Sequence, residues 1–222
     1  MSAISISPVS PAPPSTATPA TAPPSTGTLP PGLRVAPRIA PAKGRILVTA
    51  TRRFYDDGIR SVGVDLLISE SQVTKATFYK HFGSKDRLVL NYITAQRDAI
   101  IESLANLLSA HEDAAVGLRL VSEAVVAKIQ APGYRGCPFV NVAAEFADPQ
   151  HPARGVVTEF HEAIHELFED ALTRLRHPMP GEAADRLVLA YIGAMTWGYV
   201  GDVIAASTAV RGTIERIVAE AR

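Results

Sequence analysis

The sequence predicts an all-α fold. From Lys43 onward, apolar residues recur every three or four positions, which is the spacing of one face of a helix. No run alternates apolar and polar residues over six or more positions, as a half-buried strand would. Helix-breaking residues separate the helical segments at Pro132-Gly133, Asp148-Pro149 and Pro178–Gly181.

Residues 1–41 have a different composition. They hold eleven of the seventeen prolines, and Ser, Thr and Ala make up most of the remainder. Proline fixes φ and lacks an amide donor, and small polar residues bury too little surface to offset the loss of chain entropy. We therefore expect a disordered tail, for which a solvated linker and an over-extended translation start are the plainest interpretations.

The first four expected helices lie close together in the sequence. Apolar residues from Ile46 to Phe54, with Leu47 and Ala50 between them, form one face of the first helix, and Gly58 ends it. Two short helices follow, and Ser84 then caps a long helix over about 85–109. The apolar positions of the two short helices are Val64, Leu67 and Ile68, and then Val73, Phe78 and Phe82.

Further helices are expected near 113–130, 137–146, 153–175, 182–205 and 208–220, with the last break around Ser207. The most apolar stretch is Leu187–Gly201, with fifteen uncharged residues between Arg186 and Asp202. A membrane span needs roughly 20 apolar residues, so this stretch predicts a buried or interface helix in a soluble protein. The single cysteine, Cys137, excludes internal disulfides and favours a reducing cytoplasm.

Three helices, of which the last two are short and about four residues apart, have the outline of a helix-turn-helix. In the third helix, Phe78 and Phe82 share one face, which we expect to point inward. Ala76 and Lys80 lie opposite them, and a small residue beside a lysine suits close approach to base edges. Thr74 is placed to cap this helix. By itself the pattern also fits any short amphipathic helix with a solvated face.

The charge distribution favours a nucleic-acid partner although the net charge is zero. Residues 34–90 carry eleven Lys and Arg against five Asp and Glu, whereas residues 91–222 carry eleven against seventeen. A basic surface attracts phosphates. In this chain the negative charge of residues 91–222 cancels the positive charge of residues 34–90, so the net charge does not reveal the basic segment.

The segment Arg45–Leu88 resembles the DNA-binding domain of the TetR family of transcriptional regulators without a gap. The shared features are an R-I-L opening, F-x-x-x-G at the end of the first helix, and V-T-K-A-T-F-Y-K-H-F followed by S-K. The resemblance implies DNA contacts from the recognition helix and from the starts of the second and fourth helices. These residues are Ser61, Gly63, Thr74, Lys75, Ala76, Thr77, Tyr79, Lys80, His81 and Lys85.

Two residues depart from the family pattern. Gln72 stands where the turn glycine is usual, so a side chain must adopt a left-handed conformation at a cost of roughly 1 kcal/mol. Gly63 stands where Thr is common, which removes a hydroxyl suited to a phosphate. Both departures predict weaker binding or an altered site preference. A DNA partner would also make the basic end of the tail, from Arg34 to Lys43, a candidate arm for phosphate or minor-groove contacts.

The segment Arg135–Arg154 contains G-C-P-F-V-N-V-A-A-E-F and resembles a motif in the ligand-binding part of one TetR subgroup. Within it, Cys137, Asn141, Ala144 and Glu145 fall near one helical face, which makes Cys137, Asn141 and Glu145 candidates for lining an effector pocket. Asn141 and Glu145 also fit helix capping or a buried hydrogen-bond network. Cys137 fits a small buried hydrophobe better than a redox sensor.

The segment from His161 to His165 reads H-E-x-x-H, the signature of zinc metallopeptidases, with Glu162 as the catalytic base. It supports one alternative, a metal-dependent hydrolase, although no third ligand follows at a suitable spacing. Ordinary helix residues are the plainest interpretation, and a histidine pair that titrates near neutral pH is a candidate effector contact. Tyr191 and Trp197, in the most apolar helix, are further effector candidates. Packing in the core or in a dimer interface is the plainer interpretation of both.

The resemblance implies that the last two helices pair with their copies in a homodimer. Gly193, Ala194, Gly198 and Gly201 would allow helices to approach closely there. The expected organisation is a tail over 1–41, a DNA-binding domain over 42–90, and a helical ligand-binding and dimerisation domain over 91–222.

The expected function is that of a transcriptional repressor, released from a palindromic operator by a small molecule. We expect no cofactor, no metal, no membrane association and no enzymatic activity. A helical adaptor with a degenerate DNA-binding motif remains the second alternative.

Overall fold

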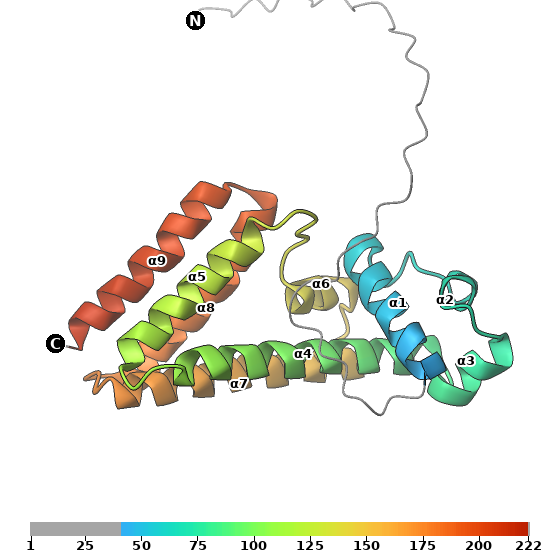
Figure 1. The fold of residues 1–222 in the computed structure, drawn as a ribbon, viewed down its shortest axis with the longest axis horizontal. Helices are drawn as coiled ribbons and strands as arrows, with labels where there is room; N and C mark the ends of the chain where they lie inside the picture. The colour runs from blue at the N-terminus through green and yellow to red at the C-terminus, as the bar shows by residue number, and fades with distance from the viewer. Residues whose placement is uncertain (1–40, 222) are drawn as a thin grey trace, which may run out of the picture. The chain divides into compact units, whose positions relative to one another are not determined.

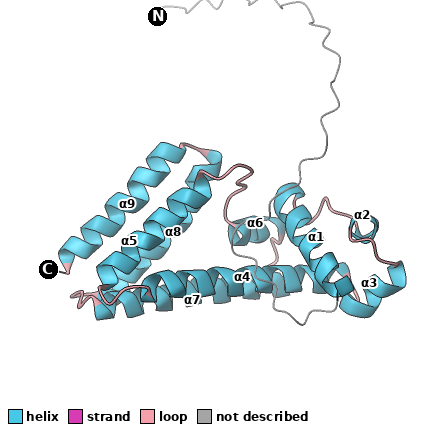
Figure 2. Ribbon diagram, in the orientation of Figure 1, coloured by secondary structure: helices cyan, strands magenta, loops and turns pink. Residues whose placement is uncertain are grey.

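The computed structural model describes residues 41–221, and within this range helices are the only regular elements (Figures 1 and 2). The predicted all-α class is confirmed. The tail expected over 1–41 lies outside the described residues except for Pro41, which is the first residue of the first helix. In chain order the helices are α1 (Pro41–Asp57), α2 (Val64–Glu70), α3 (Lys75–Phe82), α4 (Lys85–Ser109), α5 (Ala114–Ile129), α6 (Pro138–Glu145), α7 (Pro152–Arg174), α8 (Pro180–Val200) and α9 (Val203–Glu220).

Local signals account for the ends of the first four helices. α1 ends before Gly58, whose φ of 86° lies in the left-handed region that favours glycine. Thr74 caps α3 because its hydroxyl accepts a hydrogen bond from the Thr77 amide. Ser84 caps α4 in the same way, through the Arg87 amide. The caps expected at Thr74 and Ser84 are therefore confirmed.

One hydrophobic core extends from Ile46 in α1 to Val218 in α9. α1 packs on α2, α3 and α4, and α4 packs further along its length on α5 and α7. Figure 1 shows α4 and α7 side by side, with α1, α2 and α3 around one end of α4. α4 is consequently the helix that joins the first three helices to the rest of the core.

The remaining helices pack closely because small residues separate them. α8 packs on α7 and α9, and α5 packs on α4 and α9. A Cβ at Gly198 would lie 2.8 Å from the Cβ of Ile129, so the backbone of α8 runs directly against α5 at this point. The short α6 is fixed to α7 by Phe139, whose ring stacks on Phe160 with 3.6 Å between the ring centres.

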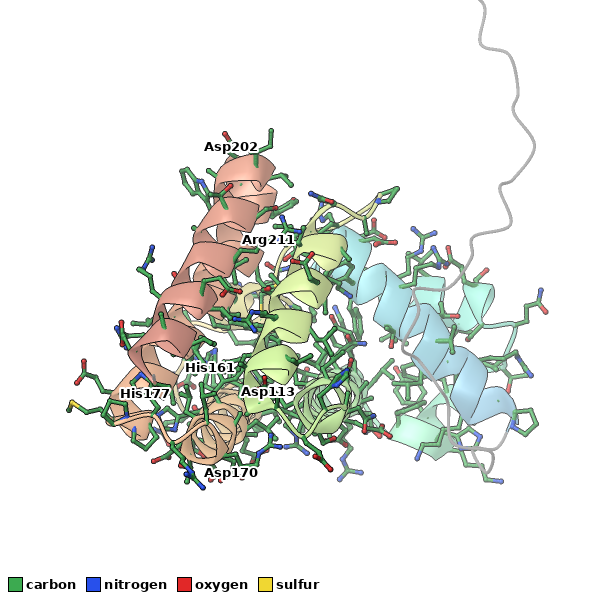
Figure 3. The ribbon with its side chains drawn as sticks, turned by 60° about the vertical axis from the view of Figure 1, so that its left-hand side comes forward. Asp113, His161, Asp170, His177, Asp202 and Arg211 are labelled. Atoms are coloured by element: carbon green, nitrogen blue, oxygen red, sulfur yellow. The ribbon has the colours of Figure 1, made fainter. Side chains whose placement is uncertain are left out.

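The break before the last helix was predicted at the wrong place. α8 ends at Val200 and α9 begins at Val203, whereas the sequence pattern had placed the break around Ser207. Asp202 makes the new start, because its carboxylate accepts hydrogen bonds from the amides of Ile204 and Ala205 (Figure 3). Ser207 lies buried inside α9 and donates to the Val203 carbonyl, which satisfies its hydroxyl without ending the helix.

The apolar stretch Leu187–Gly201 forms most of α8 and is amphipathic in three dimensions. Leu187, Tyr191 and Met195 are buried, whereas Leu189 is 73% exposed and Trp197 is 53% exposed. None of the helices within residues 41–221 combines the length and the apolar character that crossing a membrane would require.

Candidate nucleic-acid interface and effector region

α3 has one buried face and one exposed face. Phe78 and Phe82 are buried in the core and hold the helix in place, as expected from their spacing. The opposite face is exposed and includes two lysines and a tyrosine that is 44% exposed. Its exposed residues are Lys75, Ala76, Tyr79 and Lys80. Lys75 lies 3.9 Å from a carboxylate oxygen of Asp65, and both side chains are largely exposed. The buried phenylalanines thus present the cationic and hydroxyl groups of α3 to solvent.

The turn between α2 and α3 is held by a side chain from α1. The Arg45 guanidinium donates to the carbonyl of Ser71 at 2.9 Å and to the carbonyl of Gln72 at 3.2 Å. The φ of Gln72 is 52°, which confirms the left-handed conformation expected at this position. Arg45 thereby satisfies two turn carbonyls and fixes α1 against the turn.

A second link joins α1 to α2. Both Arg52 and Arg53 donate to the carboxylate of Glu70, and Arg53 also pairs with Asp57 at 2.9 Å. The hydrogen bond from Arg53 holds the pKa of the Glu70 carboxyl below its ordinary value, and the same contact raises the pKa of Arg53. These groups are partly solvent-exposed, so they orient the helices more than they stabilise the fold.

The remaining candidate DNA contacts lie before α2, near the end of α3 and at the start of α4. Ser61 is exposed, and its hydroxyl donates to the carbonyls of Asp57 and Gly58. Gly63 is the residue before α2, and a Cβ there would meet no atom within 4 Å. His81 is half-buried near the end of α3. Lys85 is half-buried at the start of α4, where burial lowers its pKa and the nearby Glu145 carboxylate opposes that shift.

Of the candidate effector residues Cys137, Tyr191 and Trp197, two are buried and one is exposed. Cys137 is buried just before α6, and burial raises the pKa of its thiol, which disfavours the reactive thiolate. Tyr191 is buried in α8 with its ring edge-on to Phe168. Trp197 faces outward on the same helix. Cys137 and Tyr191 are therefore buried in the same core, where burial and then the Cys137 group raise the pKa of Tyr191, whereas Trp197 is exposed.

Asn141 and Glu145 are both engaged in structural hydrogen bonds, the alternative that the sequence had left open. Asn141 donates to the Arg135 carbonyl at 2.9 Å and so closes the loop before α6. The two oxygens of Glu145 accept from the amides of Ile59 at 2.9 Å and Arg60 at 2.7 Å. No local sequence signal indicates the contacts of Glu145, because its partners are 86 and 85 residues away.

The two histidines of H-E-x-x-H border a surface groove between α7 and α8 with a volume of about 390 Å³. His165 Nε2 lies 3.2 Å from a carboxylate oxygen of Asp185, and burial lowers the pKa of His161 (labelled in Figure 3). Across residues 41–221, no three His, Cys, Asp or Glu side chains are grouped so that they could hold a metal ion. The groove is lined by His161, Glu162, His165, Glu166, Asp185 and Val188.

The structure separates the four candidate dimer residues. Gly193 is exposed with open space beside it, but Ala194 and Gly198 are buried within their own chain. Gly201 lies beneath the ring of Trp197. The expectation that Ala194 and Gly198 face a partner is therefore not supported, because both residues lie on the face of α8 that packs against the core of their own chain.

A different set of exposed residues occupies the outer face of α8 and the start of α9. Leu189, Gly193 and Trp197 are spaced four residues apart and lie on the exposed side of α8. Val200 and Ile204 continue the exposed apolar surface at the turn into α9. The four-residue spacing was readable in the sequence and was missed.

Taken together, a fixed pair of short helices, a partnered turn and an exposed basic α3 define a helix-turn-helix DNA-binding protein. Residues 46–92 match the family model described as bacterial regulatory proteins, tetR family. The structure is similar to that of SCO4454, a TetR-family transcriptional regulator from Streptomyces coelicolor, at 33% identity and a TM-score of 0.77. That match covers 81% of this chain and 95% of SCO4454. The chain belongs to the TetR family.

Two further regulators are similar in sequence. The HTH-type transcriptional regulator LmrA of Bacillus subtilis is 26% identical over 133 residues, which are 59% of this chain and 71% of LmrA. The HTH-type transcriptional activator FasR of Mycolicibacterium smegmatis is 30% identical over 95 residues, which are 42% of this chain and 43% of FasR. Membership of a family of DNA-binding transcriptional regulators excludes the hydrolase alternative.

Proposed function

We propose that the protein is a ligand-responsive repressor that binds a palindromic operator as a homodimer. In this proposal, residues 42–90 contact the DNA, and residues 91–222 bind the effector and dimerise. The observation that carries the proposal is the exposed basic face of α3, opposite a face that is buried in the core.

The DNA contacts follow from which side chains are exposed. Lys75, Tyr79 and Lys80 carry groups that reach phosphates, and Ala76 and Thr77 suit base edges and thymine methyl groups. Ser61 and Gly63 at the start of α2, Thr74 and His81 at the ends of α3, and Lys85 at the start of α4 complete the proposed surface. Lys85 contributes a charge that is held in place by the packing of α4.

Dimerisation is supported by the exposed apolar face of α8 and α9. Leu189, Trp197, Val200 and Ile204 are large apolar residues exposed to solvent, and such patches mark interaction sites. Gly193 lies between Leu189 and Trp197 and leaves room for a close helix. A symmetric dimer reading successive major grooves needs its recognition helices about 34–36 Å apart, which is one turn of DNA.

The response to a ligand requires two states of the dimer. One state matches the operator spacing, and an effector favours the other by binding it more tightly. Repression relieved by an effector is the first candidate. The likeness to the activator FasR makes activation the second, and transcription measured with and without the regulator from a promoter that contains the bound site would separate them.

The test begins by selecting the DNA fragments that the full-length chain binds. Replacing Tyr79 and Lys80 together by Ala is expected to abolish specific binding, because both side chains lie at the proposed phosphate contacts. Lys80→Ala alone should weaken binding and make the plot of log affinity against log salt less steep, by roughly 0.9 for each phosphate that the lysine no longer neutralises.

Lys128→Ala is the matched control, because it removes a lysine from α5, outside the proposed surface. Burial lowers the pKa of Lys128, so thermal melting should first show that this variant is folded. Unchanged affinity and salt dependence in the Tyr79 and Lys80 double variant would contradict the assignment of α3. Screening compounds for release of the selected fragment would then identify the effector.

A further inference from the structure

The segment that leads into α6 is hydrogen-bonded to α1. The Tyr55 hydroxyl donates to the Gly136 carbonyl at 3.0 Å and accepts from the Arg135 amide at 2.9 Å. Burial raises the pKa of this hydroxyl, so the phenol keeps the proton that it donates. One side chain of α1 therefore holds two consecutive backbone groups just before α6.

The far end of α6 is attached to the same part of the molecule. Glu145 is the last residue of α6, and its carboxylate accepts from the amides of Ile59 and Arg60. Hydrogen bonds to a carboxylate are stronger than those between neutral groups. The positive φ of Gly58 shapes this turn, and a Cβ at Gly58 would lie 3.5 Å from a Glu145 oxygen. The turn continues directly into Ser61, one of the proposed DNA contacts.

Between these two attachments, α6 is buried against the C-terminal core. Phe139 is fully buried and stacks on Phe160 in the middle of α7. Val142 and Cys137 are buried in the same core. A displacement of α7 near Phe160 would consequently move α6. Because both ends of α6 are hydrogen-bonded to α1 or to the turn after it, that turn would move as well.

We infer that Tyr55 and Glu145 are positioning residues that couple α6 to the DNA-binding helices. The inference rests on the proposed function, because it requires that the dimer has a DNA-matched state and a second state. The coupling free energy between two sites is reciprocal, so if the state of α6 changes the affinity for DNA, DNA binding at α3 changes the stability of that state of α6 by the same free energy. The effect can therefore be measured with DNA alone, before any effector is known.

The experiment compares amide hydrogen exchange of the full-length chain with and without a duplex that it selects from genomic fragments. In the wild-type chain the duplex should slow exchange in residues 75–82, which contact it, and also in residues 134–146, which do not. In a Tyr55→Phe, Glu145→Gln double variant, the duplex should slow exchange in residues 75–82 only. The amides of Ile59 and Arg60 should exchange faster in this variant whether or not DNA is present.

Affinity alone would not test the inference. Removing the Glu145 carboxylate takes a negative charge away from Lys85, which favours phosphate binding, while it also loosens the turn that carries Ser61. The two effects on affinity have opposite signs. Exchange in residues 134–146 is free of this ambiguity because it reports the coupling directly.

A control variant removes an equivalent carboxylate outside the measured segments. Glu123→Gln removes a carboxylate that pairs with Arg211. This variant should keep the DNA-dependent change in residues 134–146. If thermal melting shows that the double variant is unfolded, Tyr55→Phe alone decides, because it keeps the ring and removes only the hydroxyl.

The outcomes separate this inference from the proposed function. Protection of residues 75–82 without any change in residues 134–146 of the wild-type chain would overturn the coupling and leave the DNA-binding role intact. A DNA-dependent change that persists in the variant would overturn the role of Tyr55 and Glu145. Absence of protection in both segments would overturn the proposed DNA contacts themselves.

Discussion

At the turn between α2 and α3, Gln72 occupies a backbone conformation that favours glycine. An L-residue there costs roughly 1 kcal/mol relative to glycine. The conformation is kept because Arg45 holds the carbonyls of Ser71 and Gln72, and because α2 and α3 are packed on both sides of the turn. The strain at Gln72 is thus local, whereas the contacts that keep its conformation come from Arg45 in α1 and from the packing of α2 and α3.

Replacing Gln72 by Gly is expected to raise the free energy of unfolding by up to about 1 kcal/mol, because glycine relieves the left-handed strain. The gain is reduced by the greater entropy of glycine in the unfolded chain. Urea denaturation of the two proteins measures the difference. Gln96→Gly, in the middle of α4, is the control and should lower stability by about 1 kcal/mol. A similar loss of stability in both variants would show that Gln72 carries no strain.

At the scale of the element, the two faces of α8 have different surroundings. Its inner face packs on α5 through Gly198, whose hypothetical Cβ would lie 2.8 Å from the Cβ of Ile129. Its outer face carries Gly193, beside which a Cβ would find open space. The two glycines are five residues apart in the same helix, so they differ in environment and not in backbone.

This contrast predicts opposite effects of the same substitution. Gly198→Ala should lower the free energy of unfolding by about 1–3 kcal/mol, because the added methyl group overpacks the contact with Ile129. In the monomer, Gly193→Ala should raise it by up to about 1 kcal/mol, because alanine is the better helix former and no atom of the same chain lies within 4 Å of the added Cβ. Thermal or urea denaturation at a protein concentration low enough to keep the chain monomeric measures both. Equal effects would contradict the inward assignment of Gly198.

At the scale of the whole molecule, the core leaves an apolar face around Leu189 uncovered. Replacing Leu189 by Glu is expected to dissociate the proposed dimer, because a charge would be buried between two apolar faces. Sedimentation velocity measures the oligomeric state, and operator affinity should fall with it because each protomer reads only half of the site.

Ala127→Glu is the control for Leu189→Glu, since it adds the same charge to an exposed position on α5 outside that face. It should leave both the oligomeric state and the operator affinity unchanged. A Leu189→Glu protein that sediments as the wild type would place the dimer contact elsewhere.

The division proposed at residue 90 falls inside α4, and the core is continuous across it. Leu88 and Tyr92 are buried near the start of α4, and Leu104 and Leu108 are buried near its end. The C-terminal helices are therefore connected to α1–α3 both through α4 and through the hydrogen bonds at the two ends of α6. The DNA-binding part is best described as one end of a single packed unit.

Much of this molecule is determined by short-range information in the sequence. Apolar spacing set the phase of α1 and α3, so Phe78 and Phe82 were expected inward and Ala76 and Lys80 outward. Gly58, Thr74 and Ser84 marked helix ends through backbone conformation and capping, which involve neighbours within a few residues. The break at Asp202 was missed because Ser207, also a good capping residue, satisfied its hydroxyl inside the helix instead.

Only the tertiary structure decided which partners the side chains meet. For Glu145 the sequence left pocket lining and a structural hydrogen bond both open, and the structure shows it holding amides 85 and 86 residues away. Gly198 was a candidate for the contact with a partner, and within the chain it contacts Ile129. The sequence pattern specifies that a helix has an inner face, and it does not specify which helix covers that face. That choice depends on how all the helices fill one core together, since close packing is a property of the whole set of contacts.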